Sequence, residues 1–228
     1  MSTVAPARTF GEGPLSRAAA LVYHLLIVEL LLLATSAPGL VPLMLLDRHP
    51  SNLPLAALCA LPLGPALSAG LYALHHRRAD LADLRPVAAF RRGYTLNLGA
   101  ALRLWVPGLL WLTVIAVTLT NFPAAAVPRW WAGLLVLVAL AVTLWGANAV
   151  VIASLFAFRT RDVVRLAAYF LAGTPGVALA NAGLLIVAAA VVALWSEAVL
   201  ALLGSVFALV LLHNSRPMVA RIRTEFTA

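Results

Sequence analysis

The sequence predicts an all-α fold, a polytopic membrane helical bundle, and three observations support this class. The 228 residues are 63% hydrophobic and only 11% charged, with a mean hydropathy of +0.99. Soluble domains are close to half apolar and a quarter charged. Six stretches are long and apolar enough to cross a bilayer, which takes about 20 residues. All 16 basic residues are arginines, and most lie between these stretches. The composition argues against a soluble protein and excludes a disordered chain, a disulfide scaffold and a coiled coil.

We expect residues 1–228 to form one integral membrane domain with six transmembrane helices. Pro38 and Pro42 are expected to bend the first of them. Prolines are tolerated inside membrane helices when neighbouring groups satisfy the freed carbonyls. Only Ser196 and Glu197 separate the last two spans, which predicts a tight hairpin. The predicted spans are residues 19–46, 53–75, 99–121, 131–157, 176–195 and 198–213.

The arginines predict the orientation of the chain in the cell membrane. With both termini cytoplasmic, 14 of the 16 arginines lie on the inner side and only Arg48 and Arg129 lie outside. This is the bias of the positive-inside rule. A five-span alternative, in which residues 38–65 are re-entrant, weakens the bias. Arginines near the surface also attract anionic lipid, worth about 1 kcal/mol each. A docking surface for a cytoplasmic partner is the alternative use of the same face.

Two stretches on the predicted inner side have the pattern of short amphipathic helices. Residues 84–94 repeat apolar side chains at helical spacing, and residues 160–171 carry Asp162 in their first turn. An acidic residue at that position is favourable, because it meets the positive end of the helix macrodipole. We expect both stretches to lie on the inner leaflet and to lead into a span. Their shared order suggests a duplicated unit over residues 84–157 and 160–213.

Three polar residues inside the predicted spans are the candidate functional site. Glu29 lies about nine residues into the first span, which is roughly 14 Å deep at 1.5 Å per residue. A charge at mid-bilayer costs about 2.5–3.5 kcal/mol, so Glu29 should face the bundle interior. Asn148 lies at a matching depth, and Arg103 lies within reach of Glu29. The functional hypothesis makes Glu29 a proton or substrate site with these two partners. The alternative is interhelical hydrogen bonding, worth about 0.6 kcal/mol per bond.

Small residues and prolines alternate with leucines over residues 62–70. Small residues four positions apart allow helices to approach closely. A broken apolar helix can also form a substrate site at mid-membrane. We predict close helix packing, and the expected positions are Gly64, Pro65, Ser68 and Gly70.

Catalytic and metal-binding motifs are missing from the sequence. There is no H-E-x-x-H, no G-x-S-x-G and no glycine-rich phosphate loop. Asp47 and His49 are too few ligands for a metal, and the single Cys59 cannot form a disulfide within the chain. Neighbouring residues do not share a ligand on a helix, so His75 and His76 are interpreted as interfacial. We therefore expect a non-enzymatic protein without catalytic residues, metal, cofactor or nucleic-acid partner.

The segment over residues 63–72, Leu-Gly-Pro-Ala-Leu-Ser-Ala-Gly-Leu-Tyr, resembles a motif of the YesL-like family of bacterial integral membrane proteins. The family has a Gly-Pro-Ala segment that ends in Leu-Tyr. A second stretch is similar to the family's F-x-x-x-F/Y-x-x-N pattern before an apolar span. The positions of this second match are Phe90, Tyr94, Asn97 and Trp105. The similarity covers residues 20–115, and the first span reads Glu29-Leu-Leu-Leu where the family has Asn-Leu-Leu-Trp.

The resemblance implies a multi-span protein without an established biochemical activity. Its relatives are commonly associated with carbohydrate-uptake loci that encode ABC transporters. We therefore expect an accessory or regulatory component of carbohydrate ABC transport, with the lipid bilayer and transporter subunits as partners. The chain has no ATP-binding loop, so any ATP coupling must come from a partner. The alternatives are a small transporter or channel that uses Glu29 as its coupling group and, third, a membrane enzyme. Homo-oligomerisation stays open.

Overall fold

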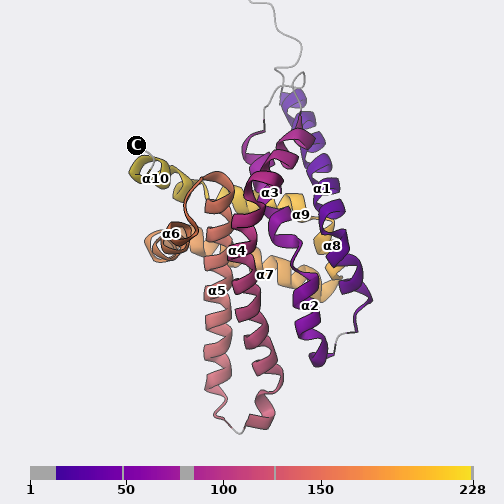
Figure 1. The fold of residues 1–228 in the computed structure, drawn as a ribbon, viewed down its shortest axis with the longest axis vertical. Helices are drawn as coiled ribbons and strands as arrows, with labels where there is room; N and C mark the ends of the chain where they lie inside the picture. Colours follow the sequence, from indigo (N-terminus) through magenta and orange to yellow (C-terminus); the bar gives the residue numbers. More distant parts are fainter. Residues whose placement is uncertain (1–13, 48, 78–84, 126, 227–228) are drawn as a thin grey trace, which may run out of the picture.

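The computed structural model describes residues 14–47, 49–77, 85–125 and 127–226, and its regular secondary structure there is entirely helical (Figure 1). Four helices are long and apolar enough to cross a membrane. They are α1 (Pro14–Leu45), α4 (Pro86–Thr120), α5 (Trp130–Leu155) and α7 (Pro175–Leu194). The short helix η1 (Pro50–Asn52) with α2 (Leu53–Cys59), and α3 (Leu63–His75), form a fifth candidate bent by 43°. An all-helical fold with four or five candidate spans is thereby confirmed.

Residues 60–62 divide the predicted span 53–75 into α2 and α3. Pro62 has no N–H, so it cannot continue the hydrogen-bond ladder of α2. The indole N–H of Trp105 on α4 donates to the Ala60 carbonyl at this break, over 2.9 Å. A Cβ on Gly39 of α1 would overlap the carbonyl at the end of α2, so the two backbones are in contact. Neighbouring helices therefore stabilise the break.

The prediction that residues 84–94 form a separate short helix is wrong. The described part of this stretch belongs to α4, which runs without interruption from Pro86 to Thr120. Pro86 suits the first turn because its missing N–H would have no intrahelical partner there. The helix also accommodates Pro107. By contrast, α6 (Thr160–Gly173) is a separate helix with one buried face, as its pattern predicted. The buried residues of α6 are Val163, Leu166, Ala167 and Phe170.

The last predicted span, residues 198–213, is not continuous. It consists of α8 (Glu197–Ala201) and α9 (Gly204–Asn214), separated by Leu202 and Leu203. The 11 residues of α9 reach about 16 Å, short of the roughly 30 Å of a bilayer core. The remaining elements are η3 (Phe122–Ala125), between α4 and α5, and α10 (Arg216–Phe226). Four spans, or five with the bent pair, therefore meet the length test where the sequence predicts six.

The helix α3 lies at the centre of the bundle. It contacts α1, α4, α5 and α9, and nine of its residues are buried. In Figure 1, α1, α4 and α5 run along the long axis, and α4 and α5 form an antiparallel hairpin. In the same view α7 crosses the direction of α5, while α6 and α10 lie to one side. The helices α1, α5 and α9 therefore all pack against α3.

Candidate functional site

Glu29 lies on the buried side of α1 against the N-terminus of α9, and only 9% of the residue is exposed. Its Oε2 accepts a hydrogen bond from the backbone N–H of Ser205 over 2.6 Å. Ser205 is the second residue of α9, and the first N–H groups of a helix have no intrahelical partner. A carboxylate there also faces the positive end of the helix macrodipole. Glu29 therefore caps a helix that lies 176 positions away in the chain.

The second carboxylate oxygen of Glu29 is buried and has no hydrogen-bond partner. A Cβ built on Gly204 would lie 3.4 Å from this Oε1 and 3.5 Å from a methyl of Leu32. The first residue of α9 and the next turn of α1 thus enclose the carboxylate. The Glu29 carboxylate is therefore held between α1 and the start of α9.

The other two predicted site residues do not join Glu29. Arg103 is exposed on α4, and Asn148 is 1% exposed on α5 with an unpartnered Oδ1. In the described ranges, no hydrogen bond or ion pair links any two of these three residues. Ser205 was not among the predicted partners of Glu29. The signal for this partner in the sequence is Gly204, because an isolated glycine interrupts the apolar run 198–213 at the point where α9 begins.

A second buried polar residue of α1, His24, faces α3. Its Nε2 lies 3.2 Å from the Ala73 carbonyl, and a carbonyl can only accept, so Nε2 carries the proton. Nδ1 is buried without a partner. His24 belongs to a buried stripe in which residues recur every four positions. The stripe consists of Ala20, His24, Val28, Leu32 and Ser36.

The predicted packing positions on α3 face three different helices. All four are buried, and they are Gly64, Pro65, Ser68 and Gly70. Gly64 faces the ring of Trp105 on α4, where a Cβ would lie 2.7 Å from Cδ1. Gly70 faces a leucine of α1, which a Cβ would approach to 3.2 Å. The Ser68 hydroxyl lies 2.8 Å from that of Ser154 on α5 and hydrogen-bonds with it. Small residues on α3 therefore leave room for side chains of α1, α4 and α5 to pack directly against it.

An apolar cavity of about 240 Å³ lies between α3, α4, α5, α7 and α9. Its polar side chains are mostly occupied: Thr143 and both tryptophans of its wall donate to backbone carbonyls. Asn181 of α7 is the exception, being 2% exposed with both amide atoms unpartnered. A conduit for a polar solute needs polar groups that replace the water around that solute. Among the described residues that line this cavity, only the Asn181 amide is available to do so.

Metal chemistry has no candidate centre in the part of the chain that the structure describes. No group of three or more His, Cys, Asp or Glu side chains there could hold an ion. Comparison of the chain with protein-family models, curated proteins and solved structures finds no match. The resemblance of residues 63–72 to the YesL-like family therefore stays a prediction.

Proposed function

We propose that this protein is a non-enzymatic, multi-pass component of the cell membrane that assists or regulates a carbohydrate ABC transporter. The observation that carries the proposal is the exposed apolar surface of the candidate spans. Only 17–33% of the residues in their most apolar windows are buried within the chain. Apolar surface that extends over most of a helix requires lipid or another membrane protein to cover it. The association with carbohydrate transport rests on the family resemblance.

The lining of the apolar cavity supports an accessory function over a conduit. Its only unsatisfied polar side chain among the described residues is that of Asn181, which cannot replace the hydration shell of a sugar. The Glu29 carboxylate accepts a hydrogen bond at the start of α9, and Gly204 lies against it. The chain also has no ATP-binding loop. Movement of a sugar would therefore depend on the partner.

We further propose six passes with both termini cytoplasmic, counting α2–α3 and α8–α9 as broken crossings. Irregular backbone at membrane depth is tolerated where protein groups bury it and satisfy its hydrogen bonds. At the start of α9, the Glu29 carboxylate accepts the backbone N–H of Ser205. The 14-to-2 division of arginines supports the orientation. Fusions to green fluorescent protein and alkaline phosphatase test it. We expect fluorescence after residue 228 and phosphatase activity after residue 196. Phosphatase activity at both positions would overturn the arrangement.

The accessory function is tested in the source organism by deleting the gene. We expect uptake of the transported sugar to fall while uptake of amino acids is unchanged. A photo-crosslinking residue replaces Trp111, which is 62% exposed on α4, to identify the neighbour. The matched control replaces Ala149, which is 0% exposed on α5. Crosslinks from position 111 to a permease subunit support the proposal. Normal sugar uptake together with crosslinks only to lipid would contradict it.

The second candidate function is a proton-coupled transporter, favoured by the buried, unpartnered Oε1 of Glu29. Protonation of this carboxylate would weaken the cap of α9 and so couple proton binding to a helix movement. Vesicles that contain only this protein and a trapped pH dye measure proton flux. This candidate requires acidification that Glu29→Gln abolishes and Ser36→Ala preserves. Flux equal to that of empty vesicles rejects it.

A further inference from the structure

A groove with a strongly basic lining lies where the ends of α3 and α9 meet α10. Its volume is about 540 Å³. No Asp or Glu is among the described residues that line it. We call it the basic groove, and its basic residues are His75, Arg77, His213, Arg216 and Arg223. Three guanidinium groups around one depression, without a lining carboxylate, favour an anion as the occupant.

Two arginines of the basic groove have geometry that suits anion binding. The Arg223 Nη2 lies 2.7 Å from His75 Nε2 and donates to it, which fixes the guanidinium at the groove wall. Arg77 has one guanidinium nitrogen, Nη1, that is buried and has no hydrogen-bond partner among the residues that the structure describes. Buried polar groups nearly always have a partner. The donor at Arg77 therefore indicates a place for an acceptor that the described residues do not supply.

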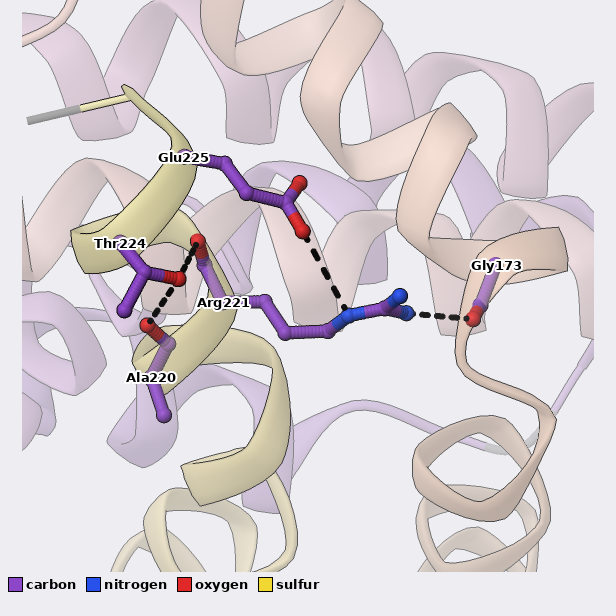
Figure 2. Close-up of polar contacts among 5 residues, drawn as sticks. All are labelled: Gly173, Ala220, Arg221, Thr224 and Glu225. Atoms are coloured by element: carbon purple, nitrogen blue, oxygen red, sulfur yellow. Dashed lines mark hydrogen bonds and ion pairs between the residues drawn. The ribbon is translucent and has the colours of Figure 1, made fainter.

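Arg221 shows that not every arginine of α10 serves the basic groove. Figure 2 shows its side chain extending from α10 towards Gly173, the last residue of α6. Its Nη1 donates to the Gly173 carbonyl over 3.1 Å, and its Nε lies 3.7 Å from a carboxylate oxygen of Glu225. Arg221 is exposed like Arg216 and Arg223, but it does not line the groove. It is therefore a matched control on the same helix.

The position of the basic groove indicates which anion it receives. The apolar helices α3 and α9 end beside it, at His75 and Asn214. From there α10 continues as a helix with three buried apolar residues and exposed arginines. The end of apolar membrane helices is the level at which lipid phosphates lie. Guanidinium groups bind phosphate oxygens in bidentate geometry.

We propose that the basic groove binds the phosphate of an anionic phospholipid headgroup. Basic pockets between membrane helices on the cytoplasmic side are known to hold such lipids. The proposal rests on the membrane placement given under the proposed function, and it is independent of the ABC transporter. Topology fusions therefore test the placement separately from lipid binding.

Native mass spectrometry of the purified full chain in a neutral detergent tests the proposal. The probes are phosphatidylglycerol, phosphatidylcholine with the same acyl chains, and inorganic phosphate as a competitor. We expect the first phosphatidylglycerol to bind more tightly than phosphatidylcholine. Arg77→Gln, Arg216→Gln and Arg223→Gln should each weaken it about fivefold, which is about 1 kcal/mol per arginine. Arg221→Gln should leave the affinity unchanged.

Two results would overturn the lipid assignment. One is equal affinity of all four variants for phosphatidylglycerol. The other is displacement of the lipid by millimolar inorganic phosphate, which would identify a free phosphate compound as the occupant. Because Arg77 is partly buried, its variant could misfold, and helix content by circular dichroism checks this. Arg216 and Arg223 are exposed, so their variants retain the fold and decide the test alone.

Discussion

Replacing Glu29 by leucine should destabilise the start of α9 without affecting α1 itself. In the wild-type protein the Glu29 carboxylate accepts the Ser205 N–H over 2.6 Å at a site that is almost fully buried. Leucine fills a similar space but has no acceptor. The Ser205 N–H would then be buried without a partner. Glutamine keeps a carbonyl oxygen for the same bond and removes only the charge.

The leucine variant loses the hydrogen-bond acceptor and the glutamine variant loses only the charge, so the expected losses of stability differ. A hydrogen bond to a charged group contributes about 1.5–3 kcal/mol, so Glu29→Leu should cost about that amount at α9. Glu29→Gln loses the interaction of the charge with the helix macrodipole, worth about 0.3–1 kcal/mol. A cost of 1.5–3 kcal/mol corresponds to a change of roughly 10- to 150-fold in a local equilibrium constant. The stability of the start of α9 should therefore fall in the order wild type, Glu29→Gln, Glu29→Leu, and this order is the critical result.

Amide hydrogen exchange measures the local equilibrium at Ser205, and thermal unfolding in detergent measures the whole protein. We expect Glu29→Leu to accelerate exchange at the start of α9 by this factor and to lower Tm. Ser36→Ala is the control, because Ser36 is buried on α1 but bonds to the Leu32 carbonyl of its own helix. Equal exchange at Ser205 in wild type and Glu29→Leu would refute the capping role. So would a glutamine variant as unstable as the leucine variant.

Four further substitutions, one of them a control, test the packing around α3 and the neighbouring cavity by thermal unfolding in detergent. Gly64→Ala places a Cβ 2.7 Å from an atom of the Trp105 ring and should cost about 1–3 kcal/mol. Gly99→Ala, which meets no atom within 4 Å, should be neutral or stabilising, and an equal loss at both positions would contradict the contact. Trp105→Phe removes the donor to Ala60 and should cost about 0.5–1.5 kcal/mol, so an unchanged Tm would exclude a stabilising bond. Asn181→Leu removes two buried, unpartnered amide atoms and should raise stability by about 1–3 kcal/mol, whereas a lower Tm would indicate a partner for Asn181.

The long helices could be read from the sequence because their signal is local. About 20 consecutive apolar residues predict a span wherever its neighbours lie. Residues 131–157 and 176–195 correspond closely to α5 and α7, and residues 160–171 to α6. Residues 84–94 were predicted as a separate helix because their amphipathic pattern differs from the apolar run that follows. The structure continues one helix through both, from Pro86 to Thr120, because the backbone hydrogen bonds of a helix do not depend on the polarity of its side chains.

The sequence by itself predicted that the chain is helical and apolar, and it located the four long apolar helices. It also predicted continuous spans at residues 53–75 and 198–213, which the structure divides. It also identified Glu29 as an acid in an apolar helix that needs a partner. Only the tertiary structure decided that the partner is the start of α9 and not Arg103 or Asn148. The physical reason is that the partner is a backbone N–H group at a helix N-terminus, and the local sequence there does not show which distant side chain will reach it. Glu29 and Ser205 lie 176 positions apart, so folding alone brings them together.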